Sequence, residues 1–107
     1  ALEHGPQTTV EVSGLAANAL GAKQAGRICY DLARATGTNC VNVEDEAIAD
    51  AQKRLWTALR LVVEPAGAAA LAALLSGAYC PQKDERLAVL LCGANPAASP
   101  FGPAKLQ

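Results

Sequence analysis

Apolar and polar positions along the first third of the chain predict a short strand followed by a helix. Residues 8–12, TTVEV, alternate in polarity and are rich in β-branched side chains, a pattern typical of a strand. After Lys23, apolar residues recur at helical spacing until Gly37, and they predict a helix of about three turns that stops at this glycine. The apolar positions of this helix are Ala25, Ile28, Leu32 and Ala35.

The middle of the chain repeats this order. Residues 39–43, NCVNV, predict a short strand, and the acidic residues 44–46 that follow suit the positive end of a helix dipole. A second helix is expected beyond them, with polar side chains mostly on the face opposite its apolar stripe. We expect Trp56 and Leu59 to lie in the core. The stripe consists of Ile48, Ala51, Leu55 and Leu59.

A third helix is expected after the apolar run at residues 61–63, which includes two β-branched valines. Pro65 suits the first helical position, because the amide hydrogen that proline lacks would have no helical partner there. The helix should run to Ser76. Gly77 is then placed to cap it in the left-handed region of backbone conformation.

The last third of the chain predicts a buried strand. A charged loop at residues 82–86 leads to residues 86–95, RLAVLLCGAN, a continuous apolar run typical of a strand that is buried on both faces. The alternation of strands and helices predicts an α/β fold. We therefore expect one domain, a three-layer fragment with helices packed on a short, mostly parallel sheet. The proline-rich residues 99–107 are expected to form a loose tail.

Charge and hydropathy argue against nucleic acid and membrane partners. The formal net charge is −1 and the pI is about 5.7, so the chain lacks the basic footprint of a nucleic-acid-binding protein. Glu64 interrupts the longest apolar run before it reaches the roughly 18 residues that a membrane-spanning helix needs. No basic amphipathic face suggests binding to a membrane surface.

The cysteines are expected to be reduced thiols in a cytoplasmic protein. Their spacings are wide and irregular, and no secretory signal precedes them. The chain has no CxxC pair and a single histidine, His4, so a zinc site has no plausible set of ligands. The four cysteines are Cys29, Cys40, Cys80 and Cys92.

Two stretches combine small residues with one polar group where a ligand could approach. They are VEPAGAAA, which contains Glu64, and LLCGAN, which contains Cys92. In open α/β sheets, ligands bind beyond the carboxyl ends of the strands, where both residues are expected. The simpler interpretation makes Glu64 a first-turn residue that gains a few tenths of a kcal/mol from the helix dipole, and CGAN a turn. Spacing alone favours the simpler interpretation.

Longer motifs resemble one known family. Residues 61–79, LVVEPAGAAALAALLSGAY, precede a charged loop and then RLAVLLCGAN, while SGLAANALGA at 13–22 is followed by KQAG and VNVEDEAIADAQKRLW fills 41–56. In this order they resemble the C-terminal part of the pyridoxal-phosphate-dependent serine/threonine dehydratases (ammonia-lyases) of fold type II. The resemblance covers residues 1–98, which would form the C-terminal portion of the catalytic, cofactor-binding domain.

The resemblance implies a β-elimination. Water would leave L-serine or L-threonine, and the products would be a 2-oxo acid and ammonia. Cys92 matches the position that meets the pyridine nitrogen of the cofactor. A thiol is a weak and neutral partner, so it makes the ring a more modest electron sink and favours loss of a β leaving group. Glu64 matches a polar residue that lines the pocket close to the ring.

The resemblance also assigns pocket and cation-binding residues. Gly93 and Asn95 match the turn that shapes the floor of the cofactor pocket. Ala19 matches a position that faces the substrate. The backbone carbonyls of Leu20 and Ala22 match positions that bind a monovalent cation in some relatives.

Parts of the family's catalytic machinery have no counterpart in this chain. The family's Schiff-base lysine lies upstream of the matched region, and so do its phosphate-binding glycine loop and the asparagine that contacts the cofactor ring oxygen. The chain alone is therefore expected to be inactive. None of its lysines should take the catalytic role: Lys23, Lys53, Lys83 and Lys105.

Three hypotheses about function follow. The first is a C-terminal fragment of a dehydratase, with the rest of that enzyme or a homologous subunit as its partner, a small amino acid as substrate, and a homodimer as the assembly that relatives commonly form. The second is a stand-alone, non-catalytic binding or assembly module derived from that fold. The third is a thiol-based enzyme that uses Cys92, although no histidine lies near it in sequence.

Overall fold

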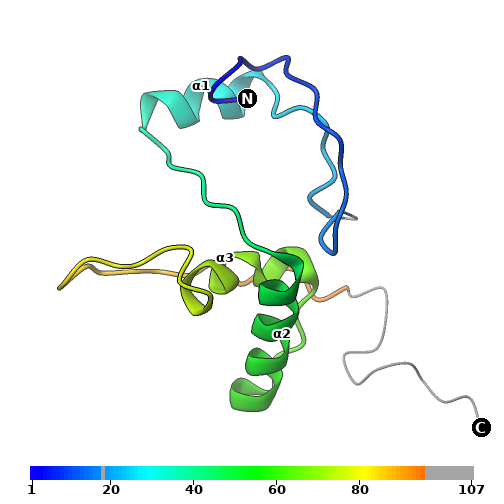
Figure 1. Cartoon of the computed structure of the whole chain (residues 1–107), viewed down its shortest axis with the longest axis vertical. Coiled ribbons are helices and arrows are strands. Elements are labelled where there is room, and N and C mark those ends of the chain that lie inside the picture. Colours follow the sequence, from blue (N-terminus) through cyan, green and yellow to red (C-terminus); the bar gives the residue numbers. More distant parts are fainter. Residues whose placement is uncertain (18, 96–107) are drawn as a thin grey trace, which may run out of the picture. The chain divides into compact units, whose positions relative to one another are not determined.

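A computed structural model describes residues 1–17 and 19–95 of the chain. It divides the chain into two compact units, residues 1–40 and residues 41–107. The described residues contain three helices: α1 (Arg27–Ala35) in the first unit, and α2 (Asp45–Leu59) and α3 (Pro65–Leu75) in the second (Figure 1). The two units are taken in turn below.

Helix α1 begins later than its apolar spacing predicts. Gly26 precedes it with φ 76° and ψ 157°, a conformation outside the helical region, so the helix cannot extend back to Lys23. The predicted end is confirmed. Gly37 has a φ of 64°, and the N–H of Thr38 donates to the carbonyl oxygen of Ala33 at 2.9 Å, as in a glycine-ended Schellman motif.

The apolar face of α1 is uncovered within its own unit. The side chains of Ile28 and Leu32 are 84% and 62% exposed, and no residue of this helix is buried. A pair of opposite charges lies one turn apart on the helix, where the Nε of Arg27 is 3.6 Å from the Oδ2 of Asp31. The predicted amphipathic pattern therefore exists without a packing partner in the first unit.

Helices α2 and α3 pack against each other and form the core of the second unit (Figure 1). The predicted acidic start of α2 is confirmed, because Asp45 and Glu46 occupy its first turn. Three positions of its apolar stripe are buried against small residues of α3, which let two helices pack closely. The buried residues are Ile48, Ala51 and Leu55 of α2, and Gly67, Ala68 and Ala72 of α3.

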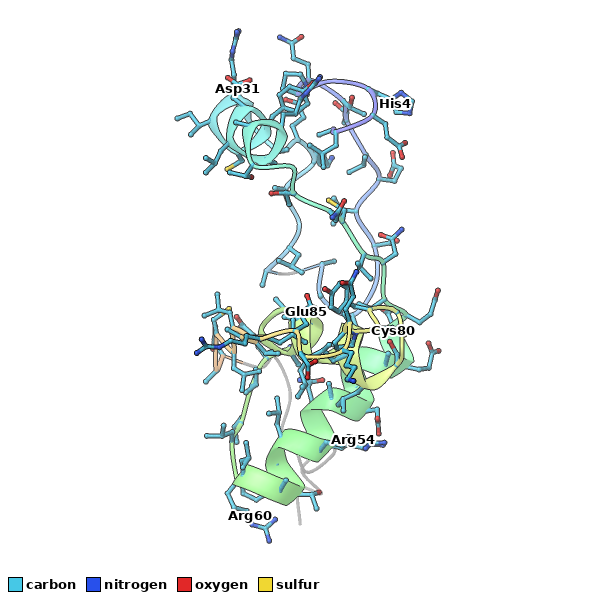
Figure 2. The ribbon with its side chains drawn as sticks, turned by 90° about the vertical axis from the view of Figure 1, so that its left-hand side faces the viewer. His4, Asp31, Arg54, Arg60, Cys80 and Glu85 are labelled. Carbon is cyan, nitrogen blue, oxygen red and sulfur yellow. The ribbon has the colours of Figure 1, made fainter. Side chains whose placement is uncertain are left out.

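The core ends before the last turn of α2. Leu59 is 61% exposed, so the prediction that it lies in the core is wrong. Trp56 is half-buried, and the guanidinium of Arg60 lies 5.5 Å from the centre of its ring. Arg60 has a left-handed conformation, with φ 57°, and ends the helix. Figure 2 shows Arg54 and Arg60 directed away from the helix.

Helix α3 has the termini that the sequence predicts. Pro65 occupies the first turn, directly after Glu64 in an extended conformation with ψ 162°. The helix ends at Leu75, one residue before the expected Ser76. Gly77 follows with a φ of 78°, which confirms its role as the left-handed residue beyond the helix end.

The predicted α/β sheet is not found. Among residues 1–17 and 19–95, no segment forms a strand, and the stretches 8–12, 39–43 and 86–95 belong to no helix or strand. A strand needs a neighbour for its ladder of hydrogen bonds, and only single backbone bonds are made, such as Val10 N–H to Lys23 carbonyl. The two helices of the second unit pack on each other rather than on a sheet.

The apolar run 86–92 is correspondingly exposed. Leu87 is 45% exposed and Leu90 is 74% exposed, so the prediction of a strand buried on both faces is wrong. An apolar run shows which residues suit a buried strand, but strands that would flank it must come from elsewhere in a chain. The described residues provide no such strand.

The charged loop before this run is organised by one carboxylate. Glu85 accepts hydrogen bonds from the Tyr79 hydroxyl at 2.5 Å and from the Gln82 N–H at 2.8 Å. Figure 2 shows Glu85 and Cys80 on this segment. The hydrogen bond from Tyr79 lowers the pKa of Glu85, and the same bond raises the pKa of Tyr79.

Two further expectations concern the tail and the membrane. The predicted loose tail, residues 99–107, lies outside the described residues. Within the described part of the chain, no helix is both long and apolar enough to cross a membrane.

Candidate functional site

The two polar groups singled out from sequence come together in the second unit. The backbone N–H of Glu64, at the start of α3, donates a hydrogen bond of 2.9 Å to the carbonyl oxygen of Gly93. This bond joins the chain beyond the apolar run 86–92 to the N-terminus of α3. Cys92 and Glu64 are therefore neighbours in space, although 28 positions separate them in sequence.

Gly93 has a backbone and surroundings that only glycine suits. Its φ is 74°, a conformation that other residues rarely adopt. A Cβ atom at this position would overlap the carboxylate oxygen Oε1 of Glu64 and lie 2.9 Å from the Glu64 Cγ. The Glu64 side chain thus lies over the backbone of Gly93. It is half-buried and does not cap α3.

Gly67, in the first turn of α3, makes a similar close contact with the backbone of Cys92. A Cβ atom on Gly67 would overlap the carbonyl oxygen of Cys92 and come within 2.6 Å of its carbonyl carbon. The backbone of Cys92 therefore rests on the first turn of the helix. The absence of side chains at Gly67 and Gly93 allows this close approach.

The thiol and the amide of the predicted site are open to solvent. Cys92 carries a free and exposed thiol. Asn95 is exposed and lies two residues beyond Gly93. A neutral thiol can donate or accept one weak hydrogen bond, and an amide can do both at once. The thiol is carried by the backbone that contacts the start of α3, next to the residue that Glu64 covers.

The remaining predicted residues belong to the first unit. Ala19, Leu20 and Ala22 are exposed in a loop where the N–H groups of Ala19 and Leu20 donate to the carbonyl oxygen of Ala16, at 3.2 and 2.9 Å. A Cβ atom on Gly21 would overlap the carbonyl oxygen of Ala17, so the loop is tightly folded. Asn18, inside the same loop, lies outside the described residues.

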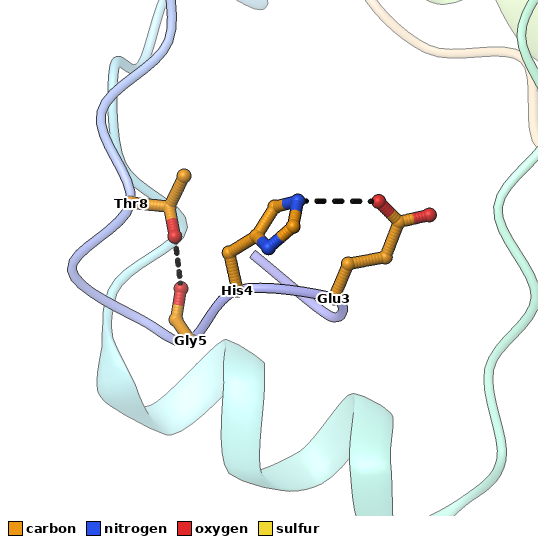
Figure 3. A network of polar contacts seen from close by, with 4 residues as sticks. All are labelled: Glu3, His4, Gly5 and Thr8. Atoms are coloured by element: carbon orange, nitrogen blue, oxygen red, sulfur yellow. Dashed lines mark hydrogen bonds and ion pairs between the residues drawn. The ribbon is translucent and has the colours of Figure 1, made fainter.

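His4 also belongs to the first unit, whereas Cys92 belongs to the second. Its Nε2 lies 3.6 Å from a carboxylate oxygen of Glu3, and both side chains are exposed (Figure 3). Nearby, the Thr8 hydroxyl donates to the carbonyl oxygen of Gly5 at 2.9 Å. The unit that carries Cys92 has no histidine, so the structure provides no support for a Cys-His pair. Among the described residues, no three histidine, cysteine or carboxylate groups gather as metal ligands.

Sequence reasoning included Gly67 only among the small residues of VEPAGAAA, without its contact with Cys92, and it did not single out Glu85. The sequence contains a signal for the contact of Gly67. A glycine inside a helix of alanine and leucine lowers helix stability by about 1 kcal/mol relative to alanine, so its presence indicates a packing constraint. Glu85 gave no signal. Its position within a charged loop did not reveal that both of its oxygens accept hydrogen bonds.

Comparison with known proteins supplies the family. The model of the pyridoxal-phosphate-dependent enzymes matches residues 1–93. The chain belongs to this family. The family is named for its cofactor, pyridoxal phosphate, and the family resemblance found in the sequence is confirmed.

Two curated relatives are dehydratases. The chain is 36% identical over 85 residues to the phenylserine dehydratase of Ralstonia pickettii, a match that covers 79% of this chain and 26% of the relative. It is also 36% identical over 98 residues to the biosynthetic L-threonine dehydratase of Salmonella typhimurium, covering 89% of this chain and 19% of the relative. The chain thus spans about a quarter and a fifth of the lengths of these relatives. No solved structure matches the chain.

The chemistry of the thiol near the start of α3 is compatible with pyridoxal phosphate. Gly67 and Gly93 carry no side chain, and a Cβ at either position would fill the close contact between α3 and the Cys92–Gly93 backbone. The exposed thiol of Cys92 beside them is a suitable neutral partner for a ring nitrogen. The two glycines set the contact between α3 and the thiol-bearing backbone, and the donor that this contact presents is compatible with the cofactor that the family uses.

Proposed function

We propose that this chain is the C-terminal portion of a pyridoxal-phosphate-dependent dehydratase and that residues 61–95 form the wall of its site beside the cofactor ring. The seating of Cys92 and Gly93 on the first turn of α3, next to Glu64, carries the proposal. Family membership and the two dehydratase relatives support it. The proposed location is the cytoplasm, in keeping with the reduced thiols expected from the cysteine spacing.

The proposed substrates are β-hydroxy amino acids, of which L-serine and L-threonine are the first candidates. When bound, pyridoxal phosphate withdraws electrons from the α-carbon of an amino acid, so that a β-hydroxyl can leave. Cys92 would offer its thiol to the pyridine nitrogen as a neutral hydrogen-bond partner. Glu64 would line the pocket and hold the Gly93 backbone. The products would be a 2-oxo acid and ammonia.

The first unit would contribute to the substrate side of the same enzyme. Ala19 would face the substrate, and the carbonyl oxygens of Leu20 and Ala22 would take a monovalent cation. Asn95 would complete the floor of the pocket with Gly93. The remaining part of the dehydratase, or a homologous subunit, would be the partner of this chain, and the assembled enzyme would be a homodimer.

The proposal predicts no elimination by the chain alone, because none of its lysines takes the Schiff-base role. With pyridoxal phosphate and L-threonine or L-serine, the 107-residue chain should produce no 2-oxo acid above the rate of the cofactor by itself. The assay is coupled reduction of the 2-oxo acid. A rate that depends on the chain, with one of its lysines trapped by borohydride, would contradict this part of the proposal.

A chimera tests the claim that this segment supports elimination when it is part of a complete dehydratase. The matching segment of this chain replaces its counterpart in the Ralstonia pickettii phenylserine dehydratase, and the hybrid is assayed with phenylserine, L-threonine and L-serine. The expected result is cofactor-dependent 2-oxo acid formation. The unaltered Ralstonia enzyme is the positive control, and circular dichroism shows whether the hybrid folds.

The exposed apolar side chains favour a second candidate function, a non-catalytic assembly module. Ile28, Leu32 and Leu90 are each more than 60% exposed, which is unusual for large apolar residues and typical of surfaces that bind another protein. The same chimera separates the two candidates. A folded hybrid that assembles normally but forms no 2-oxo acid would favour the assembly module over the dehydratase.

A further inference from the structure

The only glycine inside a helix in the described part of the chain is Gly67, and it is buried in the first turns of α3. The rest of α3 after Pro65 is alanine and leucine, which favour helices strongly. Glycine is among the least favourable residues in a helix interior. A contact that excludes a side chain at this position would explain why the sequence keeps glycine there.

That contact is with the backbone that carries the thiol. A Cβ atom on Gly67 would overlap the carbonyl oxygen of Cys92, and its next nearest atoms would be the Cys92 carbonyl carbon at 2.6 Å and the Val63 Cγ1 at 2.7 Å. A valine methyl group can move by rotation of a side chain. The carbonyl group of Cys92 can move only if the chain around the thiol moves with it.

A second contact holds the same backbone at the next residue. The Glu64 N–H donates to the Gly93 carbonyl oxygen at 2.9 Å, and the Glu64 carboxylate lies over the Gly93 backbone. The backbone of Cys92 and Gly93 is thus held at two points, by Gly67 and by Glu64. Both points belong to the first turns of α3 and its N-cap. The position of the thiol is fixed to this helix rather than to a flexible loop.

We propose that Gly67 is a positioning residue for the Cys92 thiol. By leaving room for the Cys92 carbonyl, it lets α3 hold the thiol at a set place beside Glu64. The inference rests on the proposed function for what the thiol binds, and it deepens that function by naming the residue that sets the geometry. The contact itself is testable in the 107-residue chain without cofactor.

The first test is Gly67→Ala in the full chain. If Gly67 were only a helix residue, alanine would raise the thermal midpoint by roughly 4 °C or more through its better helix propensity. We expect the midpoint to fall instead, because the new Cβ displaces the Cys92 carbonyl. We also expect the Glu64 amide to exchange its hydrogen severalfold faster, since the bond to Gly93 is lost.

Two control variants separate the sources of the effect. Ala70→Gly, at an exposed position of the same helix, measures the local preference for alanine over glycine where no backbone lies against the helix. It should lower the midpoint. The double variant Gly67→Ala with Val63→Ala removes the valine contact but leaves the contact with Cys92. The double variant should keep the fast Glu64 exchange; recovery of slow exchange would assign the effect to Val63 and overturn the proposal.

The thiol provides a readout that a purely structural role would not change. The alkylation rate of Cys92 is measured by mass spectrometry against that of Cys80, an exposed thiol in the same unit. We expect Gly67→Ala to raise the Cys92 rate severalfold and to leave the Cys80 rate unchanged. If Gly67→Ala unfolds the helix pair, Gly93→Ala releases the same backbone from its other contact and should give the same selective rise.

The outcomes distinguish this inference from the proposed function. An unchanged ratio of Cys92 to Cys80 alkylation in folded Gly67→Ala, or in Gly93→Ala where the first does not fold, overturns the positioning role whatever the chimera does. A selective rise in Cys92 alkylation together with an inactive, folded chimera supports the positioning role and counts against the dehydratase function.

Discussion

At the scale of single residues, Glu85 shows how one side chain organises a segment that composition alone presents as a solvated loop. Its two carboxylate oxygens accept from the Tyr79 hydroxyl and from the Gln82 N–H, and both bonds are exposed to solvent. They close the turn between the end of α3 and the segment that leads to Cys92. The start of the segment that leads to Cys92 is therefore ordered by a carboxylate within the loop itself.

The pH dependence of this turn follows from the pKa shifts of its two titrating groups. The pKa of Glu85 is lowered from 4.5, so its contribution is complete above pH 4.5 and is lost as the pH falls through the lowered value. The pKa of Tyr79 is raised from 10.0, so its contribution is complete below pH 10.0 and is lost as the pH rises through the raised value. The turn should be intact between these limits.

The Gln82 amide resonance reports this turn in an NMR titration of the full chain. We expect its chemical shift to be constant between the two pH limits given above, and to change as the pH falls below the lower limit or rises above the upper one. Tyr79→Phe should bring the Glu85 pKa closer to 4.5 while leaving it lowered, because the bond from Gln82 remains. Tyr30→Phe, which removes a tyrosine from the first unit, is the matched control. A Glu85 pKa that is the same in Tyr79→Phe and in the unaltered chain would refute the hydrogen bond.

At the scale of elements, the sequence predicted most helix boundaries correctly, because they depend on residues nearby in the chain. It predicted a sheet that the described residues do not form. Pro65, Gly37 and Gly77 act within one turn of their own helices, so the sequence around each one is sufficient to predict its role. A strand depends on partners that its own sequence does not specify. The run 86–92 has the composition of a buried strand, and its exposure in the structure shows what composition leaves undetermined.

The packing of α2 on α3 leads to a prediction about stability. Leu55 is 3% exposed, and Leu55→Ala should lower the free energy of unfolding by about 2–5 kcal/mol through lost burial and a new cavity. Leu59, one turn later, is 61% exposed, and Leu59→Ala should change it by no more than about 0.5 kcal/mol. Urea denaturation followed by circular dichroism measures both. Equal losses for the two variants would mean that the helix pair packs differently.

At the scale of the whole molecule, the residues that the family resemblance assigns to a site fall into two groups, one in each unit. The sequence predicted Cys92, Gly93 and Glu64 as one group, and the structure brings them together through the Glu64 N–H and the Gly93 carbonyl. Ala19 and Leu20 lie in the other unit. The contact of Gly67 with Cys92 was not predicted, because a contact between a helix and a distant backbone leaves only an indirect trace in sequence, a glycine where alanine would be the better helix former.

The role of Cys92 is the central claim, and its most direct test is the rate of 2-oxo acid formation by chimeras that carry Cys92→Ser and Cys92→Asp. Serine is also a neutral partner, so we expect that variant to stay within about tenfold of the unaltered chimera. Aspartate would place a negative charge at the ring nitrogen and hold it protonated, and we expect a loss of roughly 100-fold. Cys80→Asp, at another exposed cysteine, should have no effect. A Cys92→Asp chimera as active as the unaltered one would contradict the account.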